Sequence, residues 1–265
     1  MQIDITRYGG LYDMNNLELK EKYDKVFKDG SDNFFTCNVF HEAHSIVGIC
    51  DWEHKTVMDV GCGEGILPAM IDHAGAEYVV GVDYSEEAIS NANKKFDVSN
   101  LKFLCDDYRL IEGRFDTITM QGVMEHLDSP WDELKNMIDN HLEEDGVLIT
   151  SSPSFINPRG YVWMTLVKLF DVPMSLTDLH YICPFDMEKF CNENNYELEY
   201  QSIHQDWGSG ETMIRDFNKR LRNALSDAGM DNSRVDDLLE WMHQANFYFD
   251  TNEATGAIVI YKITK

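Results

Sequence analysis

Three glycines at alternate positions, Gly61, Gly63 and Gly65, stand between an apolar run and a helical pattern. The apolar run is Thr56–Val60, and apolar residues then recur at helical spacing from position 66 to position 74. Glycine lets backbone N–H groups approach a ligand closely because it has no Cβ atom. The segment therefore predicts a strand, a ligand-binding turn and a helix, with a plain tight turn as the alternative.

The same succession of strand, turn and helix continues to residue 150. Short apolar runs predict strands over residues 56–60, 78–82, 101–105, 115–120 and 147–150. Helices are predicted over residues 66–74, 85–96 and 131–142, and Ser85 is suited to cap the second of them. Strands that alternate with helices indicate an α/β fold, with a doubly wound parallel sheet covered on both faces.

The order of the glycines bears on the class of ligand. Dinucleotide enzymes carry G-x-G-x-x-G, whereas this loop has G-x-G-x-G, with Asp59 just before it and Glu64 inside it. Two carboxylates at a turn repel a pyrophosphate and suit a ligand that carries an ammonium and a sulfonium. A nicotinamide oxidoreductase is therefore the less favoured alternative.

Acidic residues at the ends of the next two strands extend this site. Asp83 ends the second strand, where an acid can accept both hydroxyls of a ribose. Asp106 and Asp107 follow the third strand and can accept an exocyclic amine, and Tyr108 beside them is available to stack on a base. Together these positions describe an amino acid joined to adenosine.

Four segments in order, VMDVGCGEG, VVGVDYS, LCDDY and FDTITMQGVMEHL, resemble the successive motifs of class I S-adenosylmethionine-dependent methyltransferases. The MEHL sequence is similar to the small-molecule branch that includes the ubiquinone-pathway O-methyltransferases. The resemblance is strong over residues 55–155 and weaker over 180–204. It implies a Rossmann-like, seven-stranded and mostly parallel sheet that ends in an antiparallel hairpin, here residues 196–203 and 257–263.

The resemblance also implies S-adenosylmethionine as the cofactor and S-adenosylhomocysteine as its product. The three glycines are expected to hold the methionine part, with Asp59 orienting the loop and Asp83 binding the ribose. For Gln121, a simple amide at a strand end is the alternative. The expected cofactor-binding residues are Asp59, Gly61, Gly63, Gly65, Asp83, Tyr84, Asp106, Asp107 and Gln121.

Two histidines are candidates for a general base that takes the proton of an acceptor hydroxyl. His180 precedes a helix predicted over residues 185–194 and is expected above the carboxyl ends of the strands, and His126 follows the fourth strand. A structural role is the alternative for both. In the ubiquinone-pathway enzymes a similar Glu-His pair, joined by an acid three residues before the Glu, is associated with a divalent metal. That position is Gly122 here, so no metal is predicted.

Candidate residues for binding the acceptor lie outside the four motifs. Arg159, in the sequence Asn-Pro-Arg, is suited to anchor a carboxylate or a phosphate, with a surface arginine as the alternative. Aromatic residues can line an acceptor pocket, although aromatics at helical spacing are more often part of a helix core. The candidates are Tyr161, Arg159, Tyr181 and Trp207.

The chain divides into four parts, with helical additions around the core. Helical patterning over residues 17–27 and 38–49 predicts an N-terminal lid. Two amphipathic stretches near the C-terminus predict an insertion that caps the site or forms a dimer contact. The parts are residues 1–53 (the helical lid), 54–210 (the S-adenosylmethionine-binding core, with an acceptor segment over 153–184), 211–250 (the helical insertion) and 251–265 (the last strand).

The composition excludes several classes of partner. The formal net charge is −25, from 22 basic and 47 acidic residues. Nucleic-acid binding depends on cationic surfaces, so no DNA or RNA substrate is expected. No apolar run reaches the ~18 residues of a membrane span, no signal peptide is visible, and no cysteine forms a CxxC pair. A cytoplasmic protein, monomeric or homodimeric and without a membrane partner, is expected.

The expected activity is methyl transfer from S-adenosylmethionine to an oxygen of a small-molecule acceptor. One alternative acceptor is a sugar, a nucleotide-linked compound or another polar precursor, methylated on oxygen or nitrogen in surface-polysaccharide or secondary metabolism. An alternative of another class is a non-catalytic module that senses S-adenosylmethionine.

Overall fold

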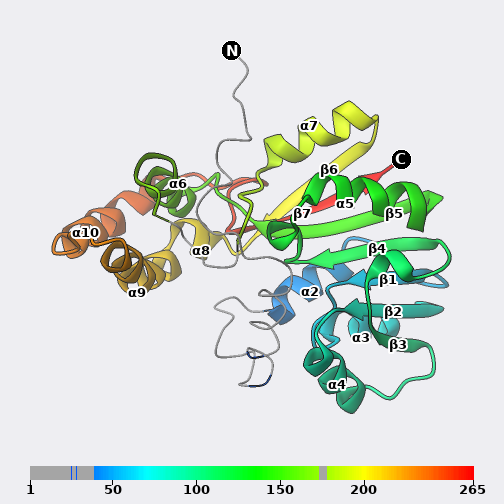
Figure 1. The fold of residues 1–265 in the computed structure, drawn as a ribbon. Coiled ribbons are helices and arrows are strands. Elements are labelled where there is room, and N and C mark those ends of the chain that lie inside the picture. The colour runs from blue at the N-terminus through cyan, green and yellow to red at the C-terminus, as the bar shows by residue number, and fades with distance from the viewer. Residues whose placement is uncertain (1–24, 26–27, 29–38, 173–177) are drawn as a thin grey trace.

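The computed structural model describes Lys25, Lys28 and residues 39–172 and 178–265. The helix predicted over residues 17–27 and most of the predicted lid lie outside these described residues, apart from the two lysines. Within the described part, one sheet has helices on both faces, and a further group of helices lies to one side of it (Figure 1).

The strands fall where the apolar runs of the sequence lie. They are β1 (Thr56–Val60), β2 (Tyr78–Asp83), β3 (Leu101–Cys105), β4 (Phe115–Gln121), β5 (Leu142–Pro153), β6 (Glu197–Ile203) and β7 (Ile258–Thr264). Their order in the sheet is β3-β2-β1-β4-β5-β7-β6. The strands β1 to β5 run parallel, and β7 runs antiparallel to both β5 and β6. The doubly wound sheet with its terminal hairpin is therefore confirmed.

The inner strand β1 has neighbours on both edges and helices over both faces, which explains its largely apolar sequence. Val57 pairs with Val79 of β2 and with Thr117 of β4. From β1 the chain steps outward through β2 to β3 and then returns to β4 on the other side of β1. In an open α/β sheet a ligand binds where the strand order reverses, outside the carboxyl ends of the strands. The ligand site is therefore expected at the ends of β1 and β4.

One group of helices packs on each face of the sheet and encloses an apolar core there. Val57 of β1 belongs to one core and Met58 to the other, because successive side chains of a strand point to opposite faces. The first group is α2 (Val39–Val47), α3 (Ile66–His73) and α4 (Glu86–Lys95). The second is α5 (Pro130–Asn136), the π-helical turn η5 (Met137–His141) and α7 (Pro184–Asn194), with the short turns η3 (Tyr108–Leu110) and η4 (Met124–His126).

A third group of helices forms the helical cap. It consists of α6 (Pro158–Phe170), α8 (Gln205–Ser209), α9 (Glu211–Asp227) and α10 (Val235–Ala245), followed by the turn η6 (Asn246–Tyr248). Trp163 of α6 and Phe217 of α9 are fully buried in its core, with ring centroids 5.6 Å apart. α6 follows the carboxyl end of β5, and α8 to α10 connect β6 to β7. Because β6 runs parallel to β5, the carboxyl ends of both strands point the same way. The cap therefore lies on the side of the sheet where the strands end and where a ligand is expected (Figure 1).

Three elements differ from their predicted extents. β5 runs from Leu142 to Pro153, well beyond residues 147–150, because β4 and β7 pair with it on both sides. The helix predicted to reach residue 142 is α-helical only to Asn136 and continues as the wider turn η5. The five residues of α8 are too few to show a helical period, so the sequence does not predict this helix.

No helix in residues 39–172 and 178–265 combines the length and the apolarity that a membrane span requires. α9 has 17 residues, and its buried residues Met213, Phe217, Leu221 and Leu225 form a single stripe. This stripe packs in the core of the cap, and the other face of α9 is polar.

Candidate functional site

The glycine loop after β1 has a backbone that only glycine adopts readily. Gly61, Gly63 and Gly65 have φ values of 73°, 51° and 81°. A Cβ atom at Gly65 would lie 2.5 Å from the ring of Phe103, and one at Gly61 would collide with the side chain of Val123. The loop is therefore a tightly packed turn whose backbone only glycine fits at these positions.

Asp83 joins the end of β2 to this loop. Its Oδ2 accepts a hydrogen bond of 2.9 Å from the N–H of Gly63, and its Oδ1 accepts one of 2.9 Å from the N–H of Ser85. The side chain of Ser85 in turn accepts from the N–H of Ala88 and caps α4, as the sequence predicts. The carboxylate is thereby fixed beside the loop.

Asp59 lies under the loop on β1, almost completely buried. Its Oδ1 accepts a hydrogen bond of 2.5 Å from the hydroxyl of Thr119 on β4. Burial raises the pKa of Asp59 to about 7, and the negative charge of Asp83 adds to the rise. A positively charged ligand group above the loop would favour the ionised form of Asp59.

The side chains of Glu64 and Tyr108 do not have the orientations expected for a cofactor site. Glu64 does not turn its charge toward the loop, because its carboxylate binds Nζ of Lys95 at 2.7 Å and Nδ2 of Asn91 at 3.0 Å. Tyr108 does not offer its ring to a base, because it is buried in the core with its hydroxyl on Glu133. The anion beside the loop is therefore Asp83, through its bond to Gly63.

The adjacent acids after β3 have different surroundings. Asp107 caps η3 and binds Arg109, whose Nε lies 2.9 Å from Oδ1, and these hydrogen bonds lower the pKa of Asp107. Asp106 donates its backbone N–H to the carbonyl oxygen of Asp83 at 3.2 Å. Asp106 is thus held next to the end of β2, and Tyr84 beside it is 40 % exposed.

A second group of polar residues lies at the ends of β4 and β5. Glu42 of α2 is only 4 % exposed, and the side chains of Gln121 and Ser151 hydrogen-bond its carboxyl group. Glu125 of η4 is 5 % exposed, and its Oε2 has no hydrogen-bond partner. Burial raises the pKa of both glutamates, and for Glu125 the negative charges of Asp178 and Glu42 add to the rise.

Both candidate histidines lie beside this group. Nδ1 of His126 is 3.7 Å from Oδ1 of Asp178. The ring of His180 hydrogen-bonds the backbone carbonyls of Leu127 and Asp128, and its Nε2 is buried without a partner. Burial lowers the pKa of His180. The structure thus brings both histidines to the carboxyl end of β4, with His126 beside a carboxylate.

This arrangement matches a known family. A family model described as a methyltransferase domain matches residues 39–201, more than half of the chain. The chain belongs to this family. The methyltransferase is 28 % identical over 164 residues to the ubiquinone biosynthesis O-methyltransferase of Neisseria meningitidis serogroup C, covering 58 % of this chain and 68 % of that protein. It is an S-adenosylmethionine-dependent enzyme.

Solved structures share the fold of the methyltransferase at low sequence identity. The DhpI–SAM–HEP complex superposes with a TM-score of 0.64 at 9 % identity, covering 96 % of this chain and all of that one. The methyltransferase in the complex with the Haloferax volcanii Trm112 activator gives a TM-score of 0.61 at 16 % identity, covering 92 % and 97 %. The likeness extends over the cap as well as the sheet, since the coverage is nearly complete.

The acceptor candidates are dispersed across the methyltransferase. Tyr181 packs edge-on against Phe155, with ring centroids 5.3 Å apart, and Tyr161 is 58 % exposed. The surface alternative for Arg159 is wrong, because this residue is 2 % exposed. Its Nε lies 3.3 Å from Asp216 of α9, and its guanidinium stacks 4.4 Å from the ring of Trp207. Arg159 and Trp207 therefore join α6 to α8 and α9 within the cap.

Sequence reasoning missed Glu42 and Asp178. Each is a single acidic residue without a motif around it, and Glu42 stands in a helix whose other residues give only an amphipathic pattern. Glu42 is placed by contacts with the ends of β4 and β5, and Asp178 by contacts of its segment with η4. Across the described residues, no group of three or more histidine, cysteine or acidic side chains is arranged to hold a metal ion.

We expect Gly65→Ala to lower the affinity for S-adenosylhomocysteine at least tenfold, measured by calorimetry, because the new methyl group meets Phe103 and displaces the loop. Gly229→Ala is the matched control. Gly229 also has a positive φ of 68°, but nothing lies within 4 Å of its added Cβ. The control should lose about 1 kcal/mol of stability and keep its affinity. Equal affinities of the two variants would contradict this role for the loop.

The raised pKa of Asp59 predicts a pH-dependent stability. Between the ordinary pKa near 3.8 and the folded value of about 7, the folded state holds a proton that the unfolded state has released. The ligand-free protein therefore loses up to roughly 4 kcal/mol from this residue as the pH rises through that window. The free energy of unfolding, measured in urea at pH 5 and at pH 8, should fall between the two pH values in the wild type and not in Asp59→Asn.

Asp97→Asn, a substitution at an exposed position, is the control and should keep the wild-type pH dependence. An unchanged pH dependence in Asp59→Asn would contradict the assignment.

Proposed function

We propose that the methyltransferase transfers a methyl group from S-adenosylmethionine to an oxygen of a small-molecule acceptor. The observation that carries the proposal is the arrangement at the strand-order reversal, where Asp83 holds the glycine loop and Glu42 contacts Gln121 at the adjoining strand end. The likeness to an O-methyltransferase favours oxygen as the acceptor atom. The helical cap at the same edge and the net charge of −25 favour a small acceptor over nucleic acid.

The cofactor residues follow from the same arrangement. Gly61, Gly63 and Gly65 hold the methionine part, with Gln121 at the neighbouring strand end. A carboxylate can accept about four hydrogen bonds, so the two backbone donors of Asp83 are compatible with two ribose hydroxyls. Asp106, next to Asp83, is assigned to the adenine amine. Bound S-adenosylmethionine supplies a methyl group that its sulfonium already activates.

His126 is the better of the two candidates for the general base. The carboxylate of Asp178, 3.7 Å from Nδ1 of His126, supports this role because it can orient the ring. The ring of His180 instead hydrogen-bonds two backbone carbonyls, which suits a residue that fixes the turn after β4. Tyr181 lies next to His180 and remains a candidate for contact with the acceptor.

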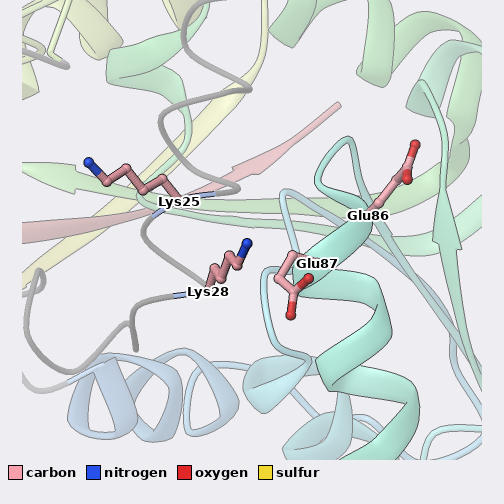
Figure 2. Close-up of a pocket in the computed structure, with 4 residues that line it drawn as sticks. All are labelled: Lys25, Lys28, Glu86 and Glu87. Atoms are coloured by element: carbon pink, nitrogen blue, oxygen red, sulfur yellow. The ribbon is translucent and has the colours of Figure 1, made fainter.

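The lid and the cap are proposed to exclude water from the site. Lys25 and Lys28 of the N-terminal segment line a hollow together with Glu86 and Glu87, the first residues of α4 (Figure 2). These glutamates follow Asp83 closely, so the hollow supports a lid over the nucleoside end of the site. The helical insertion over residues 211–250, which forms part of the cap, closes the acceptor end. Excluding water strengthens each electrostatic contact inside.

The first test is binding followed by transfer. Calorimetry with S-adenosylhomocysteine and with NADH should give binding of the first and none of the second. A methyl-labelled donor is then offered with hydroxylated aromatic compounds, sugars and amines, and the product is located by mass spectrometry. Label on oxygen is the expected result. Tight NADH binding without binding of S-adenosylhomocysteine would contradict the function, and label on nitrogen alone would contradict the acceptor atom.

We expect His126→Ala to lower kcat by about 10²–10⁴-fold for a hydroxyl acceptor, since a general base typically contributes that much. The affinity for S-adenosylhomocysteine should change little. His73→Ala, at an exposed position on α3, is the control and should retain full activity. Turnover that is unchanged at both neutral and alkaline pH would remove His126 from the reaction.

A further inference from the structure

Three carboxyl groups from separate segments converge at the carboxyl ends of β4 and β5. Glu42 comes from α2, Glu125 from η4 and Asp178 from the segment that leads toward α7. The carbonyl oxygen of Glu125 accepts the N–H groups of Leu179 at 2.8 Å and His180 at 3.1 Å. These two bonds fix Asp178, the residue before Leu179, beside η4.

The carboxylate of Glu125 is close to the end of β4. A Cβ atom added to Gly122 would lie 3.7 Å from Oε1 of Glu125, and Gly122 directly follows Gln121. Gln121 is also the residue that binds Glu42. Glu42 and Glu125 therefore both lie at the end of β4, next to the glycine loop of the neighbouring strand.

This cluster lacks a matching positive charge. Among the described residues, the ion pairs give Glu42 and Glu125 no cationic partner, and they give Asp178 only His126. Arg159 interacts electrostatically with Asp178, but its ion pair is with Asp216. Oε2 of Glu125 is buried and accepts no hydrogen bond. Without a cation, burial favours the protonated form of Glu125, whose pKa is raised. A positively charged ligand group beside it would favour the ionised form, so the cluster is suited to such a group.

We propose that Glu125, with Glu42 and Asp178, binds an ammonium group of the methyl acceptor. The inference rests on the proposed function and makes its acceptor a hydroxylated amine. The cluster lies on the β4 and β5 side of the site, whereas the loop and Asp83 that serve the cofactor belong to β1 and β2. An ammonium is a hydrogen-bond donor, and the unpartnered Oε2 of Glu125 can accept from it, while the charges of Glu42 and Asp178 act on the same position. The cap then covers the uncharged part of the acceptor.

The test compares amines with neutral partners of similar shape. The probes are tyramine against 4-ethylphenol, ethanolamine against ethylene glycol, and glucosamine against glucose, each titrated by calorimetry into the full chain saturated with S-adenosylhomocysteine. At least one amine should bind tenfold more tightly than its partner. Glu125→Gln should abolish that preference, and Glu77→Gln, at an exposed position, should keep it.

The controls separate this inference from the proposed function and from other cations. Wild-type protein that binds S-adenosylhomocysteine but prefers no amine would overturn the inference alone, whereas failure to bind S-adenosylhomocysteine would overturn the function. The affinity for S-adenosylhomocysteine should stay within twofold in Glu125→Gln. A tenfold loss would assign the cluster to the ammonium of the cofactor instead. Binding of Mg²⁺ that depends on Glu125 would assign it to a metal, and either result contradicts an acceptor site.

Discussion

The hydrogen bond between the carboxylate of Asp83 and the N–H of Gly63 is the contact on which the site depends. It joins the end of β2 to the loop that follows β1, so two neighbouring strand ends become one ligand surface. The loop can reach Asp83 only because its glycines adopt positive φ values and leave room for Phe103 and Val123. In the proposed function the same aspartate also holds the ribose, which would link the fold directly to the cofactor.

The buried acidic residues differ in whether a hydrogen-bond donor or a cation satisfies their oxygen atoms. Asp83 is satisfied by backbone donors, and Asp59 has a hydroxyl donor from Thr119. Glu125 has an oxygen atom with neither a donor nor a cation. Buried groups that fail to find a partner within the protein commonly mark functional positions. The proposed cofactor site contains the satisfied acids Asp83 and Asp59, and the proposed acceptor site contains Glu125 with its unsatisfied oxygen.

Most of the fold was predictable because it depends on local pattern. The apolar runs place β1 and β3 at their observed bounds, and the glycines place the loop. Side-chain direction was not predictable in the same way. Glu64 turns to Lys95, thirty-one positions away, and Tyr108 enters a core completed by η5. Glu42 joins the site only when α2 packs on the sheet, which no single-sequence pattern reports. Contacts between distant segments therefore account for what the sequence left open.

The most direct measurement is a crystal structure of the methyltransferase with S-adenosylhomocysteine. The account predicts that the amino-acid part of the ligand lies along residues 61–65 and that both ribose hydroxyls reach the carboxylate of Asp83. It also predicts that the sulfur points toward the end of β4. A ligand bound elsewhere on the sheet, or one that leaves Asp83 without a ribose contact, would contradict the central claim.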